Sequence, residues 1–488
     1  MQPEQSIKVS LKSKNQFTYL LLCLSALAYL LSPMTIQAST SPLSAEAIEK
    51  AVQRALIIDD GIPAYLIDVE LDQGVVSLTG IVPHLGAKER ATSVAETIKG
   101  VQSIVNRIKV SPYPYNRSDH TVKEDILESL QEDPATDSLE LTVTVENGKA
   151  ALFGVVPSLG AKELARAITA GIWGIQSVEN NLIIIPKFTR DDQEIKEEII
   201  GQLENNVWIN AHPIRVYVHE GEVTLKGIVG SLNEKRRVRR IAMTNSVTQV
   251  NDDELFIKKW AQGEVRRTTN LGHKSDKEIK EILTSAFKID PRISLGQISL
   301  DVQDGVVTLQ GKVPHLKIKQ EAEKVAKHTR GVIWVENFVN VRPTRALSDE
   351  AIKQKVKKAI SRNAYVNSRN ITPSILNGKV YLTGTAHSNF EKESATKAVA
   401  DLKGILEIEN HIVVTDTWQW KPDKLIQKDV KDELWWSPFI DSEEITMQVK
   451  NGIVTLQGTV DSWWEQEMAV RNAYEGGAKF VENHLIIQ

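Results

Sequence analysis

Large apolar residues recur at every fourth position in six short stretches of the chain. In the fourth stretch they are Ile279, Leu283 and Phe287. Residues spaced i, i+4 and i+8 lie on one face of an α helix, so each stretch is predicted to form a helix with one buried side. The central positions of the six predicted helices are Val52, Ile126, Ile199, Leu283, Val356 and Val430.

A β-hairpin is predicted after each of these helices. In the fourth copy, apolar and polar residues alternate over residues 298–303, and Val307 and Leu309 follow the pair Asp304-Gly305. Alternation gives a strand one buried and one solvated face. Asn-Gly and Asp-Gly favour a type I′ turn, because both central residues of that turn have positive φ. Similar pairs in other copies are Asn147-Gly148, Asn377-Gly378 and Asn451-Gly452.

A second helix and a last strand complete each copy. The second helix is expected to lie close to the sheet through small or apolar residues, namely Ala91, Ala165, Val238, Ala322, Ala395 and Ala469. Glycine and asparagine accept the left-handed conformation that often ends a helix. The residues expected to end this helix are Gly100, Gly174, Asn245, Gly331, Gly404 and Gly477. Residues 182–185 are an example of the apolar last strand.

Two N-terminal caps of the first helices are predicted from local sequence. Ser275 and Glu278 have the spacing of a capping box, in which each side chain bonds a free backbone N–H. Asp423, after Pro422, is expected to cap the first helix of the sixth copy.

Each predicted hairpin contains two glycines six residues apart, and this spacing recurs six times. All twelve are expected to be structural turn glycines, because the pattern lies in a hairpin and does not open a helix as a phosphate-binding loop does. The pairs are Gly74/Gly80, Gly148/Gly154, Gly221/Gly227, Gly305/Gly311, Gly378/Gly384 and Gly452/Gly458. A repeat of this length indicates one small unit written several times.

The element order α-β-β-α-β predicts an α+β fold, with six tandem modules that are each a two-layer sandwich of helices on a sheet. The third joint is longer than the others and is expected to be a hinge between two halves of three modules. The predicted modules are residues 44–112, 118–187, 190–258, 275–343, 348–416 and 423–488, and residues 259–274 are a linker.

This order, with DGVVTLQG at residues 304–311 and NGIVTLQG at 451–458, resembles the BON domain, a module of bacterial osmotic-stress and nodulation proteins. The resemblance covers nearly all of residues 44–488. It implies an envelope protein of a Gram-negative bacterium that binds phospholipid surfaces and supports membrane integrity. It also implies that the protein is not an enzyme, since the family brings no catalytic residues to carry over.

The N-terminus predicts export. Lys8, Lys12 and Lys14 precede an apolar run at residues 17–31, and Ala38 offers a small residue for cleavage. This is the order of a secretory signal peptide, so residues 1–38 are expected to be removed and the protein to reach the periplasm.

Two alternatives to a cleaved signal follow from the same segment. Residues 17–36 are long enough for an uncleaved helix that anchors the protein in the inner membrane. Lipid attachment at Cys23 is disfavoured, because Leu22 stands where lipoprotein signals usually carry a small residue.

Composition excludes several kinds of site. The chain is 41% hydrophobic and 25% charged, as in ordinary soluble proteins. Cys23 is the only cysteine, so a processed chain can form neither a disulfide nor a thiolate metal site. The chain has no H-E-x-x-H, G-x-S-x-G or P-loop motif, and we expect no metal and no cofactor. His84 and His315 occupy equivalent positions after a proline, which reflects duplication.

The third module departs most from the shared pattern. Residues 235–274 contain ten Lys and Arg and four acidic residues. Val238 and Ile241 supply the core face of its second helix, so the cations are expected to point outward. Basic residues bind anionic head groups and tryptophan favours the membrane interface. The candidate lipid-binding residues are Lys235, Arg236, Arg237, Arg239, Arg240, Lys258, Lys259, Trp260, Arg266 and Arg267.

Other interpretations of this basic segment remain open. A merely solvated helix face followed by a flexible linker explains the same charges. Nucleic acid is disfavoured as a partner because the chain carries an export signal and is acidic elsewhere. The partner expected from sequence is an anionic phospholipid surface, with envelope proteins as a further possibility. The alternative function is a periplasmic protein-binding scaffold or spacer without lipid contact.

The sixth module is rich in aromatic residues. They are Trp418, Trp420, Trp435, Trp436, Phe439, Trp463 and Trp464. A membrane or partner contact is one interpretation. Packing within and between modules is favoured, because aromatic side chains bury large areas.

Overall fold

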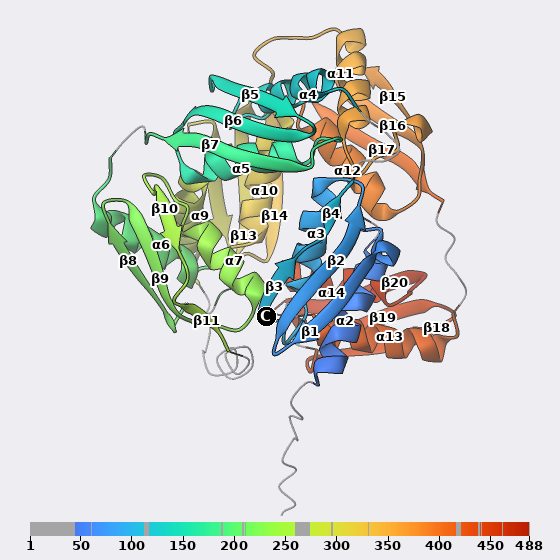
Figure 1. Ribbon diagram of the computed structural model, residues 1–488. Coiled ribbons are helices and arrows are strands. Elements are labelled where there is room, and N and C mark those ends of the chain that lie inside the picture. Colours follow the sequence, from blue (N-terminus) through green and yellow to red (C-terminus); the bar gives the residue numbers. More distant parts are fainter. Residues whose placement is uncertain are drawn as a thin grey trace, which may run out of the picture. The chain divides into compact units, whose positions relative to one another are not determined.

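The computed structural model (Figure 1) describes residues 44–487 except 60, 112–116, 187–188, 207–208, 210, 259–273, 294–295, 330, 416–420, 438–439, 441 and 461. The predicted signal peptide lies outside these residues, and so does the predicted linker apart from Lys274. None of the helices in the described part has the length and apolar character needed to cross a membrane.

The first three modules each begin with a helix, continue with a hairpin and a second helix, and end with one or two strands. Module 1 contains α2 (Ala45–Ile58), η1 (Ala64–Leu66), β1 (Ile67–Asp72), β2 (Val75–Val82), α3 (Leu85–Ala95), β3 (Ser103–Asn106) and β4 (Lys109–Val110). Module 2 contains α4 (Asp119–Glu132), β5 (Leu141–Glu146), β6 (Lys149–Val156), α5 (Leu159–Ala170) and β7 (Ser177–Ile184). Module 3 contains α6 (Asp192–Glu204), β8 (Ile214–His219), β9 (Glu222–Val229), α7 (Leu232–Ile241), β10 (Gln249–Asn251) and β11 (Leu255–Ile257).

The last three modules repeat this order with an unbroken last strand. Module 4 contains α9 (Asp276–Ile289), β12 (Ile298–Gln303), β13 (Val306–Val313), α10 (Leu316–Lys327) and β14 (Trp334–Val341). Module 5 contains α11 (Asp349–Arg362), η3 (Ser368–Asn370), β15 (Ile371–Leu376), β16 (Lys379–Ala386), α12 (Asn389–Ala400) and β17 (Glu407–Val414). Module 6 contains α13 (Asp423–Trp436), β18 (Ile445–Lys450), β19 (Ile453–Val460), α14 (Trp463–Glu475) and β20 (Phe480–Ile487).

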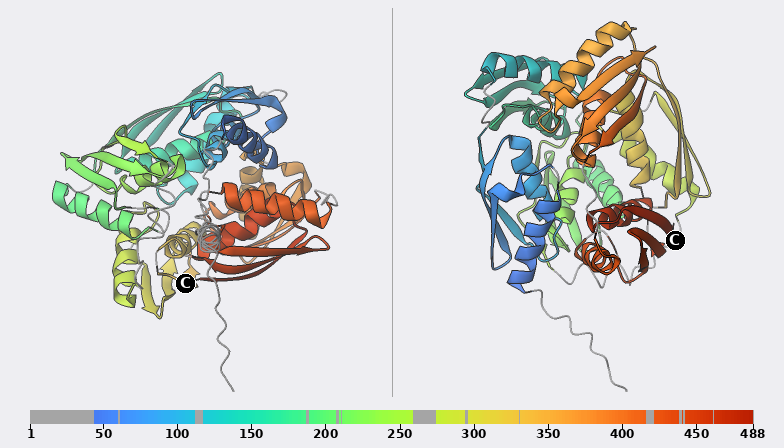
Figure 2. Two further views of the ribbon diagram at one scale, coloured as in Figure 1. Left: turned by 90° about the horizontal axis from the view of Figure 1, so that it is seen from below. Right: turned by 90° about the vertical axis from the view of Figure 1, so that its right-hand side faces the viewer.

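Every sheet has the second strand of the hairpin in its centre. In module 4, β12 pairs antiparallel with β13, and β14 pairs parallel with the other side of β13. The parallel pairing follows from α10, which returns the chain to the start of the sheet. Both helices cover the same face of the sheet, as the right-hand view of Figure 2 shows for module 1. The predicted α+β fold with six modules is confirmed.

Each module has its own apolar core between this sheet face and the two helices. In module 4 the core includes Leu283 and Phe287 of α9, Leu309 of β13 and Ala322 of α10, all without exposed surface. The central position of helix 1 and the small residue of helix 2 are fully buried in all six copies. The periodicity of the sequence therefore identified the core correctly.

The first glycine of each pair is a turn residue, as expected. Asp304 and Gly305 have φ of 48° and 74°, which is the conformation that a type I′ turn requires. The glycines at this position all have positive φ, and they are Gly74, Gly148, Gly221, Gly305, Gly378 and Gly452. The prediction that these residues shape the hairpin is therefore confirmed.

The prediction that the second glycine of each pair is also a turn residue is wrong. These glycines lie inside the central strands β2, β6, β9, β13, β16 and β19, because the strand runs on for six residues after the turn and pairs throughout. Each one stands opposite the first residue of the preceding strand, at the open end of the hairpin. They are Gly80, Gly154, Gly227, Gly311, Gly384 and Gly458.

The second glycine is structural for a different reason, namely a close approach of two backbones. Gly311 has φ of 147°, and a Cβ built there would overlap the carbonyl oxygen of Gln297, just before the paired strand. The equivalent glycines of the other modules also have positive φ and meet a carbonyl oxygen in the same way. A side chain at this position would therefore force the neighbouring strand to move.

An aspartate at the start of helix 1 bonds the hairpin turn in five modules. In module 4 the Oδ2 atom of Asp276 accepts a hydrogen bond from the Asp304 N–H at 2.9 Å, and Oδ1 accepts one from the Gly305 N–H at 3.0 Å. The same two bonds are made by Asp119, Asp192, Asp349 and Asp423. Module 1 has Ala45 at this position and lacks them.

Of the two predicted N-terminal caps, one is confirmed and the other is wrong. Ser275 and Glu278 form the predicted capping box. The prediction that Asp423 caps α13 is wrong, because Pro422 is the N-cap residue and makes no side-chain bond. Asp423 instead directs its carboxylate to the backbone N–H groups of Asn451 and Gly452, at 2.8 Å each.

The end of helix 2 also differs from the prediction. Each second helix stops before its glycine, and the glycine turns the chain toward the last strand, as Gly174 does with φ of 101°. In module 3 the residue with positive φ is Ser246, not Asn245. The reason is that the last strand of module 3 is interrupted between β10 and β11, which shifts its register against β9.

Modules of the first and second halves of the chain make contact with each other. Ile172 after α5 forms an antiparallel bridge with Asn363 after α11, which joins modules 2 and 5. Asn206 after α6 and Thr329 after α10 form the same kind of bridge between modules 3 and 4. The two predicted halves of the chain therefore pack against each other instead of meeting only at a hinge.

Candidate functional site

The basic run of module 3 lies on α7. Ser231 caps this helix, and its Oγ accepts a hydrogen bond from the Glu234 N–H at 3.1 Å. Val238 faces the core and has no exposed surface, so the arginines on either side of it occupy the rest of the helix. These arginines do not form one solvated face.

Arg236 joins module 3 to module 1. Its guanidinium donates a hydrogen bond to the Ser93 hydroxyl at 2.9 Å and forms an ion pair with Glu96, which is buried. Burial raises the pKa of Glu96, and the charge of Arg236 opposes this shift. The expectation that the cations point outward is wrong for Arg236, because the second helices of the two modules contact each other.

Two further cations of α7 bind their own module. Arg239 donates hydrogen bonds to the Val250 carbonyl and to Asp252, both at 2.8 Å. Lys235 approaches the same carboxylate at 3.8 Å. These contacts hold the interrupted last strand against α7.

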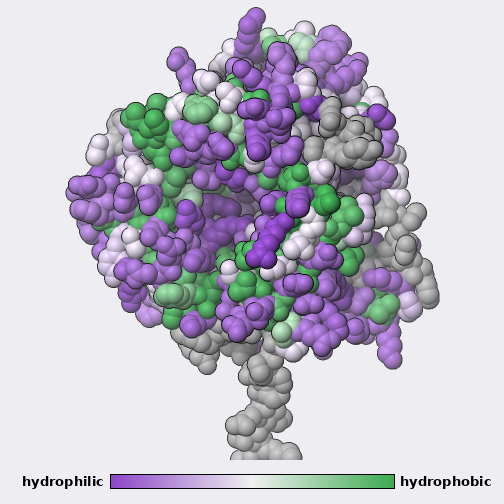
Figure 3. All heavy atoms as spheres, viewed as in Figure 1, coloured by the Kyte–Doolittle hydropathy of each residue, from purple (hydrophilic) through white to green (hydrophobic). Residues whose placement is uncertain are grey.

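Arg237 and Arg240 stand in a more positive environment. Burial, and to a smaller extent the charge of Arg240, lower the pKa of Arg237 to about 10. Burial also lowers the pKa of Arg240, followed by the charge of Arg236. Arg240 is nevertheless exposed to water. Figure 3 shows hydrophilic side chains around a hollow at α3, α5 and α7.

The remaining lipid candidates are not brought together. Lys258 directly follows β11, and its N–H bonds the Val229 carbonyl at 2.9 Å. Lys259, Trp260, Arg266 and Arg267 lie outside the described residues. Lipid contact by the basic segment stays a prediction.

The tryptophans of α14 confirm the packing interpretation. Trp464 packs against the apolar core of module 3, and its ring meets the His328 ring edge-on with centroids 4.6 Å apart. Lys327 lies over the Trp463 ring at 4.3 Å. In module 6, Trp435 is 44% exposed and contacts the edge of Trp436. Trp418, Trp420 and Phe439 lie outside the described residues.

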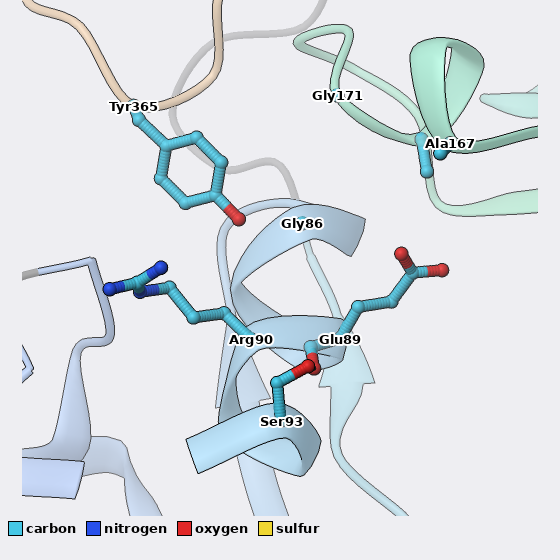
Figure 4. A pocket seen from close by; sticks show the side chains of 8 residues that line it. Gly86, Glu89, Arg90, Ser93, Ala167, Gly171 and Tyr365 are labelled. Atoms are coloured by element: carbon cyan, nitrogen blue, oxygen red, sulfur yellow. The ribbon is translucent and has the colours of Figure 1, made fainter. Parts of the chain in front are cut away.

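A polar pocket lies where modules 1, 2 and 5 meet, and Figure 4 shows it. Its volume is about 280 Å³. One face of α3 forms its floor, since residues spaced i, i+3, i+4 and i+7 lie on one side of a helix. The end of α5 and a loop after α11 form its walls. The lining residues are Gly86, Glu89, Arg90, Ser93, Ala167, Ala170, Gly171 and Tyr365.

His84 positions this pocket. Its Nδ1 atom accepts a hydrogen bond from the Ala87 N–H at 3.0 Å and so caps α3. Its ring packs edge-on against Tyr365, with centroids 4.7 Å apart. Burial lowers the pKa of His84 to about 4, so the ring is neutral. The histidines that the sequence explained only by duplication are helix caps, because His315 caps α10 in the same way.

Charged pairs fix the polar lining of the pocket. The Nε atom of Arg90 donates to Asp59 at 2.6 Å, and its guanidinium lies 3.7 Å from the centre of the Phe390 ring. Glu89 accepts a hydrogen bond from Arg166 of module 2 at 2.6 Å. Burial raises the pKa of Tyr365 above its usual range, so its hydroxyl is protonated.

Sequence reasoning missed this pocket. Glu89 and Arg90 belong to module 1, while Tyr365 belongs to module 5, and no spacing within a module relates them. The same described region contains no group of three His, Cys, Asp or Glu side chains arranged to hold a metal ion.

Comparison with known proteins agrees with the repeat. Six segments match the BON domain, at residues 44–112, 118–186, 191–258, 275–343, 348–416 and 422–488. Osmotically-inducible protein Y of Escherichia coli (strain K12) is 30% identical over 141 residues, which are 28% of this chain and 70% of that protein.

Two solved structures of CdsD, a structural protein of the type III secretion system of Chlamydia trachomatis, are also similar in part. The structure of its C-terminal domain is 16% identical and covers 47% of this chain and 100% of its own, with a TM-score of 0.12. The other is 14% identical and covers 45% and 97%, with the same TM-score. A TM-score this low supports no argument about this chain. The six domain matches do, and the chain belongs to the BON domain family, with six tandem copies.

Proposed function

We propose that this protein is a non-catalytic periplasmic protein that binds phospholipid membrane surfaces and supports the envelope under osmotic stress. The BON domains and the osmotically inducible relative support the cellular role. The basic and apolar N-terminal segment supports export.

The observation that carries the membrane contact is an exposed apolar face on the sheet of module 2. Phe153 and Val155 of β6 are 42% and 46% exposed, and Ile183 of β7 and Ile185 just after it are 63% and 57% exposed. Val155 and Ile183 are directly paired across the two strands. Figure 3 shows hydrophobic side chains gathered at the end of this sheet. Contiguous exposed apolar residues mark contacts with membranes or partners.

Electrostatic attraction would add to this apolar contact. Each basic residue near an anionic membrane contributes about 1 kcal/mol and is screened by salt. The cations of residues 259–267 are the better candidates, because Arg236 and Arg239 already bind carboxylates of the protein. Substituting the arginines of α7 would therefore disturb packing as well as any lipid contact.

Co-sedimentation with vesicles tests this proposal. The protein is expected to sediment with vesicles containing phosphatidylglycerol, less at high salt, and least after Phe153→Ser with Ile183→Ser. The matched control is Leu376→Ser with Val413→Ser, which removes apolar residues that are at least as exposed from the sheet of module 5. A second variant replaces Lys259, Arg266 and Arg267 with Ser and should lose only the salt-dependent part. Equal sedimentation of the native protein and the Phe153→Ser, Ile183→Ser variant would reject the sheet of module 2 as the contact, and no sedimentation of the native protein would reject membrane binding.

A protein-binding scaffold is the second candidate. The observation favouring it is that large apolar residues are exposed on other sheets too, including Trp334 and Phe338 of β14 and Phe480 of β20. Several sheets could then each receive a protein partner. Failure to bind vesicles, together with envelope proteins cross-linked near these residues, would favour the scaffold over the membrane.

A further inference from the structure

The pocket between modules 1, 2 and 5 contains polar groups with unused hydrogen-bonding capacity. Within the part of the chain that the structure describes, the Tyr365 hydroxyl has no hydrogen-bond partner, and Arg90 uses only its Nε atom. Glu89 uses only its Oε1 atom. Ser93 is different, because it donates to the Glu89 carbonyl and accepts from Arg236.

These unused groups form two opposite poles. Figure 4 shows Arg90 and Glu89 leaving α3 in different directions, with the Tyr365 hydroxyl directed toward the space above the helix. The positive pole consists of the terminal nitrogens of Arg90 with the Tyr365 hydroxyl beside them. The negative pole consists of the Glu89 carboxylate. The end of α5 lies on the same side and adds partial negative charge from its last carbonyls.

The protein holds both poles in place. Asp59 and the Phe390 ring fix Arg90, and Arg166 fixes Glu89. Each charge is also balanced by its protein partner, so the pocket is close to neutral. A ligand with a net charge would upset this balance, whereas a zwitterion would not. Groups fixed before binding lose little entropy when the ligand arrives.

The size of the pocket sets a limit on the ligand. Its volume of about 280 Å³ is at the low end of small-molecule sites. The residues that line the pocket between the poles are small, namely Gly86 of the floor and Ala167 and Ala170 of the wall. A Cβ at Gly86 would lie 2.5 Å from the Tyr365 hydroxyl oxygen, so a side chain there would collide with this hydroxyl.

We propose that this pocket binds a small zwitterion that carries a carboxylate and a protonated amine, the chemistry of a free α-amino acid. The carboxylate accepts hydrogen bonds from Arg90 and Tyr365. The amine donates to Glu89 and to the carbonyls at the end of α5. Since three modules supply these groups, the bound ligand also stabilises the contact of module 1 with modules 2 and 5.

Isothermal titration calorimetry with glycine tests the proposal on the purified protein. Glycine is expected to give a saturable heat and to raise the melting temperature. Acetate and methylammonium, which each carry one of the two charges, are titrated at equal ionic strength and should bind at least tenfold more weakly. No saturable heat with glycine together with an unchanged melting temperature would overturn the proposal, and comparable binding of acetate would show that a zwitterion is not required.

Two variants locate the binding. Tyr365→Phe keeps the ring contacts with His84 and Phe390 and should weaken glycine binding about fivefold to tenfold, since one hydrogen bond is lost. Tyr381→Phe removes a hydroxyl from the outer sheet face of the same module and should change nothing. Glu89→Gln keeps an acceptor for Arg166 but removes the charge, and should weaken binding at least as much. Glycine affinity that is equal in native protein and both pocket variants would overturn the assignment, and far-UV circular dichroism confirms that each variant is folded.

Discussion

At the scale of single residues, one carboxylate ties helix 1 to the hairpin in each of modules 2 to 6. In module 5 the two oxygens of Asp349 accept hydrogen bonds from the Asn377 and Gly378 N–H groups, both at 2.9 Å. These N–H groups stand in a tight turn, where a carboxylate is a stronger acceptor than water. The bonds link elements that are 28 and 29 residues apart in sequence.

Module 1 offers a direct test of this link. It has Ala45 at the first position of α2, and its turn residues Gln73 and Gly74 have the same positive φ as the others. Ala45→Asp should therefore add both hydrogen bonds and stabilise module 1 by about 1 kcal/mol. Slower hydrogen exchange at the Gln73 and Gly74 amides would measure this locally. Asp349→Ala should have the opposite effect at Asn377 and Gly378, and unchanged exchange in both variants would contradict the role of the carboxylate.

His84 predicts a pH dependence of stability. Its pKa is lowered to about 4 by burial, while an ordinary histidine titrates near 6.5. Below pH 6.5 the unfolded chain takes up a proton that the folded protein does not, so stability is full above 6.5 and falls as pH decreases toward 4. Linkage limits this loss to about 3 kcal/mol.

The variant His84→Ser isolates this contribution. Serine caps the corresponding helix in four modules, with Ser158 as an example, so the cap should survive while the titration disappears. The variant should be less stable at pH 7, because the contact with Tyr365 is lost. Its stability should then decline less between pH 6.5 and 4, as followed by urea denaturation. A pH dependence parallel to that of the native protein would contradict the lowered pKa.

At the scale of elements, most of the fold follows from the sequence pattern. The i, i+4, i+8 spacing located the helices, because only one face of each helix is buried. The positive φ of Asp304 and Gly305 confirms the turn predicted from their types. The residues that end the second helices were less predictable, because their position depends on where the following strand begins to pair with the central strand of the sheet. Asn245 was predicted to end the second helix of module 3 because it stands six residues before Asn251, as the glycines of other modules stand before their asparagines. The last strand of module 3 is interrupted, and the residue with positive φ at this point is Ser246.

Glycines in different elements should respond in opposite ways to alanine. Gly311 of β13 has φ of 147° and no room for a Cβ, so Gly311→Ala should destabilise module 4 by about 3 kcal/mol or more. Gly201 lies inside α6 with nothing within 4 Å of its would-be Cβ. Gly201→Ala should stabilise the protein by about 0.5–1 kcal/mol, because alanine favours the helix. The denaturation midpoints of the two variants measure these changes in stability. Equal shifts of the midpoint in Gly311→Ala and Gly201→Ala would show that the strand glycine has no special role.

At the scale of the whole molecule, contacts between modules were not predictable from sequence. A repeat predicts the fold of its unit, since local periodicity reports local burial. It carries no signal for pairs such as Glu132 and Lys355, which form an ion pair of 2.5 Å between modules 2 and 5. The basic run of α7 was misjudged for the same reason, because the acidic partner of Arg236 is Glu96, in another module. The pocket lined by Glu89 and Tyr365 depends equally on such contacts.

The contacts between modules 2 and 5 are reciprocal. The residues that follow α5 bond those that follow α11, since the Trp173 N–H donates to the Arg362 carbonyl at 3.0 Å. The end of α4 meets the residues after α12, where Glu132 accepts a hydrogen bond from the Lys403 N–H at 2.6 Å. In each module the C-terminal end of the first helix contacts the region after the second helix of the other module. This exchange of equivalent contacts resembles the interface of a symmetric dimer.

The two halves of the chain should therefore associate without the linker. Residues 44–258 and 275–488, produced together as separate chains, are expected to copurify, because each module has its own core and the contacts between halves remain. Glu128→Lys should weaken the complex, since Glu128 pairs with Lys358 and Arg362 of the other half at 2.6 and 3.0 Å. Glu124→Lys makes the same charge change on α4 at a residue that pairs with His120 of its own helix, and should leave the complex intact. Elution of folded halves as separate species in size-exclusion chromatography would show that the linker, and not the contacts, holds them together.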